Sequence, residues 1–192
     1  MPRLSRAESM ALTREKLLTS ARKLYLGSGY DGTSIEKIAE DGGFSRGAFY
    51  AHFSSKEAIF LELVRVDAGM LLPGLLDAVN NAASRNDMID AICAWADKRL
   101  LSRDISYLLL EVLQHAGRSN NLTAEQMSPI RENWRQLGEA LQKFFPDGEL
   151  PGQPEEVGAI VMLQIADGPF VEAAGGPSTS RLIRLMLQAF VR

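Results

Sequence analysis

Two short glycine-containing segments near the N-terminus have the spacing of catalytic or cofactor-binding motifs. Residues 27–32 read Gly-Ser-Gly-Tyr-Asp-Gly, which matches the three spaced glycines of dinucleotide-binding folds. That motif requires a preceding strand, because its glycines turn the chain from a sheet into a helix beneath a pyrophosphate. Residues 21–26 instead continue an amphipathic helical pattern. We therefore interpret these glycines as a helix end followed by a loop that needs positive φ.

Residues 43–47 match the GxSxG pattern that surrounds the nucleophile of many hydrolases. A strand must lead into that turn, and an acid and a histidine must follow it to complete a catalytic triad. His52 and His115 are present, but no strand pattern precedes Gly43. We therefore expect no hydrolase site here.

A longer pattern over residues 12–66 predicts a helix-turn-helix, which requires two short helices, a tight glycine turn and a bracing helix. Glycines at 42 and 43 supply the turn. The second short helix has small and polar residues on its expected outer face, as a helix that enters the major groove requires. These outer residues are Ser45, Arg46, Gly47, Ala48 and Tyr50, while the expected inner residues are Phe44, Phe49 and Phe53.

Local signals mark where these helices begin and end. An amphipathic helix with Leu17, Ala21, Leu24 and Tyr25 on one face should stop at Gly27 and Gly29. The segments Thr33–Glu36 and Ser54–Glu57 each read as a capping box at the start of a helix. The second of these opens a long helix, which Pro73 and Gly74 should bend or end.

The segments 33–39 and 43–57 resemble the TetR family of transcriptional repressors at many fixed spacings. The resemblance implies an all-α homodimer. A three-helix DNA-binding domain, assigned to residues 1–60, would precede a helical effector-binding and dimerisation domain, assigned to residues 61–192. It also implies a repressor released from double-stranded operator DNA by a small-molecule effector. A transcriptional activator of the same fold is the alternative.

Nine residues are candidates for DNA contacts. Arg46 is suited either to pair with guanine or to contact a phosphate. Tyr50 and His52 resemble the family's phosphate-contacting positions, although packing beside Phe53 is favoured for His52. Lys56 lies at a helix start, where its charge and the helix N-terminus both attract phosphate. The full predicted set is Thr33, Ser34, Ser45, Arg46, Gly47, Ala48, Tyr50, His52 and Lys56.

The C-terminal body has helical periodicity over residues 86–102, 104–117, 122–145, 154–174 and 178–192. Pro129 should kink or divide the third of these segments. Relatives in the resembled family have an Asp-Gly-Leu run where this chain has Asp-Gly-Pro at 167–169, so the proline raises the question of whether that helix is continuous. An apolar stripe in the last segment predicts a dimer contact through Leu182, Leu185, Met186, Ala189 and Phe190.

The effector site is predicted among the helices between about residues 86 and 174. Apolar helices there carry polar groups that could orient a ligand, although each is also suited to ordinary core packing. The candidates are Trp95, Tyr107, Glu111, Gln114, Trp134 and Met162, with His115 beside them. Carboxylates at 104 and 111 favour a cationic or neutral lipophilic effector over an anion.

The composition is that of a soluble globular protein, with 46% hydrophobic and 23% charged residues. The first sixty residues carry a net charge of +2 and the remainder −5, which favours an anionic partner at the N-terminal region. One cysteine and no signal or membrane-spanning pattern favour a cytoplasmic location. We expect no cofactor and no metal site. A helical enzyme and a protein-binding adaptor are the rival classes, and neither explains outward polar groups at groove-reading spacing.

Overall fold

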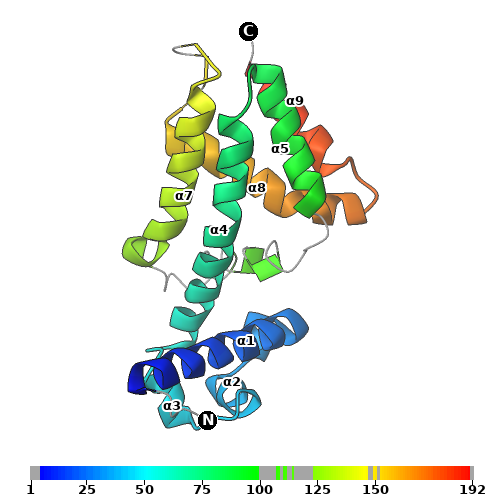
Figure 1. Cartoon of the computed structure of the whole chain (residues 1–192). Coiled ribbons are helices and arrows are strands. Elements are labelled where there is room, and N and C mark those ends of the chain that lie inside the picture. The colour runs from blue at the N-terminus through cyan, green and yellow to red at the C-terminus, as the bar shows by residue number, and fades with distance from the viewer. Residues whose placement is uncertain are drawn as a thin grey trace. The chain divides into compact units, whose positions relative to one another are not determined.

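The computed structural model describes residues 5–99, 107, 108, 110, 111, 114, 123–146, 149, 150 and 152–190. The chain divides into two compact units, Met1–Val64 and Arg65–Arg192. The regular secondary structure of the described residues is entirely helical, which confirms the predicted all-α class. The helices are α1 (Arg6–Gly32), α2 (Ile35–Asp41), α3 (Arg46–Tyr50), α4 (Lys56–Asn80), α5 (Arg85–Arg99), α7 (Ala124–Gln142), α8 (Pro154–Ala173) and α9 (Thr179–Ala189) (Figure 1).

The first helix does not end at Gly27 and Gly29 as predicted, but continues to Gly32 with a break at Gly29. Gly29 has φ 70° and ψ 173°, so two helical segments meet at a kink within α1. A side chain at this residue would be strained, because L-residues rarely adopt positive φ. The hydroxyl of Thr33 donates to the Gly29 carbonyl at 2.9 Å, which gives that carbonyl a partner at the break.

Two predicted helix caps lie one residue later than expected. Ser34, not Thr33, caps α2 by accepting a hydrogen bond from the Lys37 backbone amide at 3.3 Å. At the start of α4 the Ser55 hydroxyl, not that of Ser54, accepts from the Ala58 amide at 3.1 Å. At the first position Thr33 is buried and its hydroxyl donates to the Gly29 carbonyl, so it is not available as the cap.

An aromatic cluster stabilises the N-terminal unit. The ring of Phe60 lies 4.8 Å from that of Tyr25 and 4.7 Å from that of Tyr30, measured between centroids. All three residues are at most 4% exposed. Burial of such large rings contributes much of the stability of a small domain. It also fixes α1 against the first turns of α4, around which α1, α2 and α3 gather in Figure 1.

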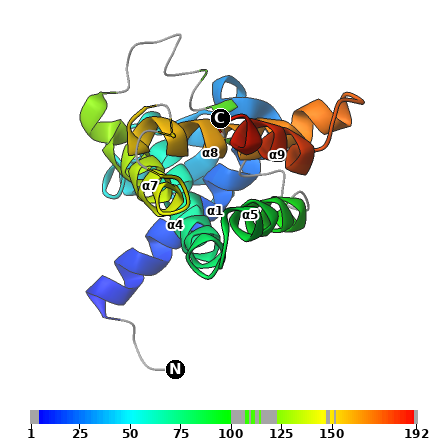
Figure 2. The same ribbon diagram turned by 90° about the horizontal axis from the view of Figure 1, so that it is seen from above.

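In the C-terminal unit, α5 and α7 flank α4, and α8 and α9 complete the bundle (Figure 2). Helices α7 and α8 approach closely at two glycines. A Cβ atom on Gly138 would lie 1.7 Å from the Pro154 carbonyl oxygen, and one on Gly158 would lie 1.8 Å from that of Trp134. Glycine is therefore required at both positions for the helix backbones to approach this closely.

Three internal prolines do not end their helices. Pro73, Pro129 and Pro169 lie inside α4, α7 and α8, each of which continues past its proline. Of the two alternatives predicted for each proline, the end of the helix at Pro73 and the division of the helix at Pro129 are therefore excluded, and a bend at Pro73 or a kink at Pro129 stays a prediction. A proline removes one helical hydrogen bond, and the packing of these helices against the unit's core compensates for that loss.

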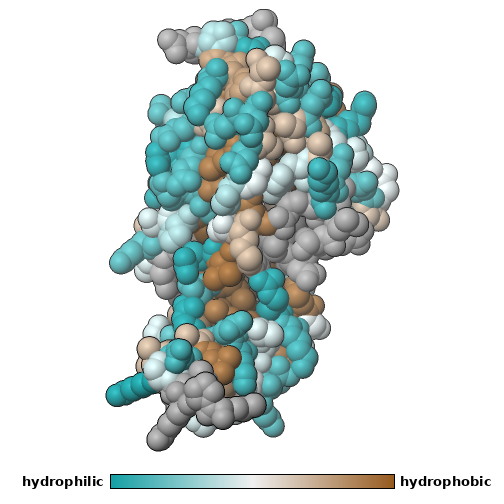
Figure 3. Space-filling model, viewed as in Figure 1, coloured by the Kyte–Doolittle hydropathy of each residue, from teal (hydrophilic) through white to brown (hydrophobic). Residues whose placement is uncertain are grey.

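The remaining predicted helices largely agree with the structure. Most of the predicted 104–117 segment, including His115, lies outside the described residues. On the face shown in Figure 3, apolar side chains follow α4, while hydrophilic ones cover much of α7. In the described residues, none of the helices combines the length and the apolar character needed to span a membrane.

Candidate nucleic-acid interface

A tight turn joins α2 to α3. Gly43 has φ 76°, and the Phe44 amide donates to the Ala39 carbonyl at 2.8 Å, which reverses the chain directly after α2. Phe49 is fully buried on the inner side of α3, and Phe53 is 5% exposed. Two aromatic anchors therefore hold a five-residue helix in a fixed orientation.

The outer side of α3 is polar and accessible, as predicted. Ser45, Arg46, Gly47 and Tyr50 are exposed, and Ala48 is half-buried. The Ser45 hydroxyl caps the helix by accepting from the Ala48 amide at 3.2 Å. The outward surface thus combines a cation, a phenol and two small residues, a composition that lets a short helix approach base edges closely.

Arg46 has two side-chain partners on this surface. Its Nη1 lies 2.8 Å from Oε1 of Glu36, and its Nη2 donates to the Tyr50 hydroxyl at 3.3 Å. The guanidinium carbon also lies 5.5 Å from the centre of the Tyr50 ring. The hydrogen bond with Tyr50 and the charge of Glu36 raise the pKa of Arg46, so its positive charge is maintained.

Sequence reasoning missed the position of Glu36 beside Arg46. We assigned Glu36 to a capping box at Thr33, which would direct its carboxylate toward the start of α2. In the structure the carboxylate bonds to Ser34 and the backbone at the start of α2, and it also pairs with Arg46 of α3. Backbone and Ser34 hydrogen bonds, together with Arg46, hold the pKa of Glu36 below its ordinary value, so the carboxylate is ionised at neutral pH. No local spacing rule would have revealed this contact between two helices.

Lys56 has a structural role that its sequence position did not indicate. Its Nζ donates to the carbonyl oxygens of Tyr30 at 2.7 Å and Thr33 at 2.9 Å, and lies 3.9 Å from the centre of the Tyr30 ring. These two carbonyls lie at the end of α1, where helix carbonyls lack helical partners. Lys56 therefore connects the start of α4 to the end of α1, and its predicted phosphate contact stays a prediction.

The other predicted DNA contacts differ in accessibility. Thr33 is 2% exposed and its hydroxyl is bonded to Gly29, so this side chain is not available to a phosphate in the observed conformation. Ser34 and His52 are half-buried. The expected phosphate contact of Thr33 therefore does not fit the structure, because tertiary packing has placed its side chain inside.

The described structure does not gather all the predicted effector residues in one pocket: three lie in or against the core of the C-terminal unit, and Tyr107 and Glu111 interact with each other. Trp95 and Trp134 are partly buried and pack against the main hydrophobic core, and Met162 belongs to that core. Tyr107 and Gln114 are exposed, and the charge of Glu111 raises the pKa of Tyr107. The ring of Tyr107 lies 6.5 Å from that of Phe170. Much of the chain around Tyr107 lies outside the described residues.

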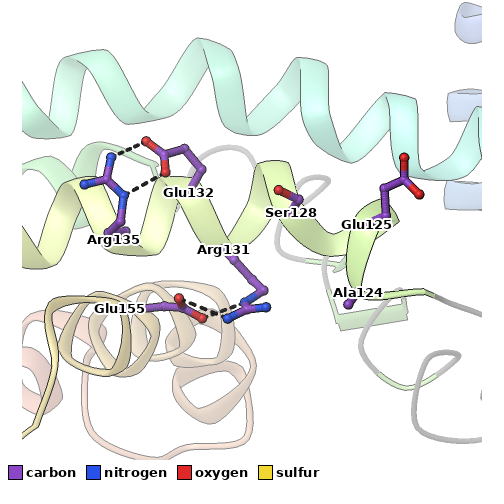
Figure 4. Close-up of a pocket in the computed structure, with 7 residues that line it drawn as sticks. All are labelled: Ala124, Glu125, Ser128, Arg131, Glu132, Arg135 and Glu155. Atoms are coloured by element: carbon purple, nitrogen blue, oxygen red, sulfur yellow. Dashed lines mark hydrogen bonds and ion pairs between the residues drawn. The ribbon is translucent and has the colours of Figure 1, made fainter.

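A groove lies instead along α7 and α8, with a volume of about 350 Å³ (Figure 4). Within it Arg131 pairs with Glu155 at 2.7 Å, and Arg135 pairs with Glu132. Hydrogen bonds with Arg135 lower the pKa of Glu132 to about 2. The lining is polar and contains none of the predicted effector residues: Ala124, Glu125, Ser128, Arg131, Glu132, Arg135 and Glu155. The described residues contain no group of three histidine, cysteine or carboxylate side chains that could hold a metal.

Comparison with known proteins places this surface in a family. Residues 17–63 match the family model described as bacterial regulatory proteins of the tetR family. The repressor AcnR of Corynebacterium diphtheriae is 39% identical over 71 residues, which are 37% of each chain. Alignments with the first curated relatives span about a third to a half of their lengths.

Solved structures of regulators share the fold over nearly the whole chain. A transcriptional regulator from Streptomyces coelicolor has a TM-score of 0.69 at 20% identity, covering 94% of this chain and 96% of that one. The regulator FadR from Bacillus subtilis, in complex with stearoyl-CoA, has a TM-score of 0.64 at 18% identity, covering 92% and 97%. The resemblance inferred from residues 33–57 is thereby confirmed: residues 17–63 match the N-terminal region of bacterial regulatory proteins of the tetR family, and curated repressors share this part of the chain.

Proposed function

We propose that this protein is a dimeric transcriptional repressor that binds double-stranded operator DNA through α3 and leaves it when a small molecule binds the C-terminal unit. The observation that carries the proposal is the surface of α3. A short helix presents Arg46 and Tyr50 outward while Phe49 anchors it from within. This arrangement supports reading of the major groove by a helix-turn-helix.

The sequence of the DNA site is defined experimentally by selecting duplexes from a random library with the full chain. We expect an enriched palindrome, since a two-fold dimer presents two copies of α3. Arg46→Ala should cost about 1–3 kcal/mol on the selected duplex if Arg46 pairs with a base. Equal losses on selected and scrambled duplexes would show instead that Arg46 contacts the backbone. Expression of a reporter gene placed under the selected site distinguishes the two modes of regulation: a repressor lowers it, and an activator raises it.

The proposed dimer contact uses the outward faces of α8 and α9. Leu185 is 53% exposed and Ile160 is 42% exposed, although both occur in helices with strongly apolar inner faces. The apolar stripe predicted for the last helix is only partly exposed in the structure. Leu185 faces outward, whereas Met186 and Phe190 pack partly against the unit's own core. We therefore expect Leu185→Glu to yield monomers in sedimentation experiments at micromolar concentration. A stable wild-type monomer under those conditions would contradict the dimer.

The effector is proposed to bind within the C-terminal unit. FadR of Bacillus subtilis, which shares the fold, was solved with stearoyl-CoA, and this supports a largely apolar ligand here as well. A tenfold loss of DNA affinity needs about 1.4 kcal/mol of coupling between the two sites. Titration of acyl-CoA thioesters and of lipophilic cations, followed by tryptophan fluorescence and DNA affinity together, tests this part. A ligand that changes the fluorescence and leaves DNA affinity unchanged would show binding without the switch.

A catalytic role or a purely protein-binding role has less support. The described residues show an arginine-bearing helix rather than a triad at the GxSxG segment, where Ser45 is a helix cap. If the selection experiment enriched no duplex, the result would favour an adaptor that binds only protein.

A further inference from the structure

We propose that Glu36 is a specificity-determining residue, which positions Arg46 for a base edge and disfavours its contact with phosphate. The inference rests on the proposed function, in which α3 enters a DNA groove. It concerns a residue of α2 that the helix-turn-helix pattern alone does not assign to DNA reading.

The geometry places three side chains in one exposed cluster. The Glu36 carboxylate lies 2.8 Å from one terminal nitrogen of Arg46, and the Tyr50 hydroxyl lies 3.3 Å from the other. The Arg46 and Glu36 side chains are 62% and 55% exposed, and Tyr50 is 44% exposed. The cluster is therefore accessible to a large ligand such as a duplex.

Pairing with Glu36 still leaves Arg46 able to bind a base. A guanidinium carries several N–H donors in a rigid plane. One terminal nitrogen of Arg46 forms the ion pair with Glu36, and the other donates to the Tyr50 hydroxyl. The remaining donors are oriented before DNA arrives, so less side-chain freedom is lost on binding. Glu36 thus acts through Arg46 and is a positioning residue.

The charge of Glu36 also separates the two kinds of DNA contact. An ionised carboxylate next to the guanidinium brings the net charge of the pair to zero. A phosphate approaching this pair is repelled by the carboxylate, whereas the acceptor edge of guanine carries no net charge. The pair therefore adds little to sequence-independent binding, which depends on neutralising phosphates. Its contribution is expected in the preference for one sequence over another.

The test compares affinities for two duplexes of equal length: the duplex selected by the wild-type chain and its scrambled counterpart. Glu36→Gln keeps the size of the side chain and removes its charge. We expect it to lower the ratio of selected to scrambled affinity about threefold to fivefold, mainly by strengthening binding to the scrambled duplex.

Glu40→Gln is the matched control. Glu40 is exposed one helical turn further along α2, so its replacement removes the same charge from the same helix without touching the Arg46 pair. We expect it to change both affinities by the same factor. In an Arg46→Ala background, Glu36→Gln should no longer change the ratio, because its effect passes through Arg46.

An unchanged ratio in Glu36→Gln would overturn the proposal. So would an equal fall of the ratio in Glu40→Gln, or persistence of the Glu36 effect without Arg46. Failure of the wild-type chain to enrich any duplex would instead contradict the proposed function itself. Circular dichroism of each variant confirms that helix content is kept.

Discussion

The two units of this chain present their predicted site residues in different ways. In the N-terminal unit, Arg46 and Tyr50 come from a single turn of helix and lie on one exposed surface with Glu36. In the C-terminal unit, Trp95, Trp134 and Met162 come from three helices and lie in or against a packed core. A surface that meets DNA must match a groove of constant dimensions, so a short segment carries its pattern. A ligand pocket is assembled from distant segments, and no short pattern identifies it.

The units also differ in what holds them together. The N-terminal unit depends on aromatic rings and on capped helix ends, whereas close backbone contact between α7 and α8 is prominent in the C-terminal unit. Four substitutions test this contrast.

The largest effect is expected at the crossing of α7 and α8. Gly158→Ala places a methyl group 1.8 Å from the Trp134 carbonyl oxygen, so the two helices must separate. We expect a loss of about 2–4 kcal/mol in the free energy of unfolding, measured by urea denaturation. Gly69→Ala in α4 is the control, since nothing lies within 4 Å of its added Cβ, and it should stabilise the protein by about 0.5–1 kcal/mol. Equal changes in the free energy of unfolding in Gly158→Ala and Gly69→Ala would contradict the close backbone contact between α7 and α8.

Loss of Lys56 is expected to weaken the N-terminal unit. Lys56→Met leaves the Tyr30 and Thr33 carbonyls without their ammonium donor, at a cost of about 1–3 kcal/mol. Hydrogen exchange of amides in residues 28–40 reports the change locally. Lys37→Met removes one exposed bond to the Gly32 carbonyl and should change stability by less than about 0.5 kcal/mol. If Lys56 also neutralises a phosphate, the salt slope of DNA affinity falls by about one unit in Lys56→Met.

A smaller effect distinguishes the two serines before α4. Ser55→Ala removes the hydroxyl that accepts from the Ala58 amide and should cost about 1 kcal/mol. Ser54→Ala should be close to neutral, because Ser54 is exposed and precedes the cap. Thermal unfolding of the two variants measures the difference. A larger loss of stability in Ser54→Ala than in Ser55→Ala would support the capping box predicted at Ser54.

The smallest effect at neutral pH is expected for Tyr30→Phe. Burial, and then the hydrogen bond to Glu57 at 2.8 Å, raise the pKa of Tyr30 above its ordinary value near 10. The folded state thus retains a proton that the unfolded state releases, so this stabilisation is present below about pH 10 and is lost as pH rises above it. Tyr30→Phe should flatten this alkaline decline in denaturation experiments, whereas Tyr50→Phe should retain it. An unchanged decline in Tyr30→Phe would contradict the pKa shift.

The sequence by itself determined the class of fold, the break at Gly29 and the residues of the turn and of α3. These depend on local periodicity, on backbone freedom and on spacing, all of which are encoded within a few residues. The resemblance over residues 33–57 depended on the same short-range pattern, and the family model that matches residues 17–63 confirms it.

Only the tertiary structure decided which of two adjacent hydroxyl residues caps a helix, and that Pro73, Pro129 and Pro169 leave their helices continuous. It also decided that Glu36 pairs with Arg46 and that Lys56 binds the end of α1. In each case the deciding contact joins residues from different helices or depends on packing against a core. Such contacts follow from how helices pack, which the local order of residues does not specify.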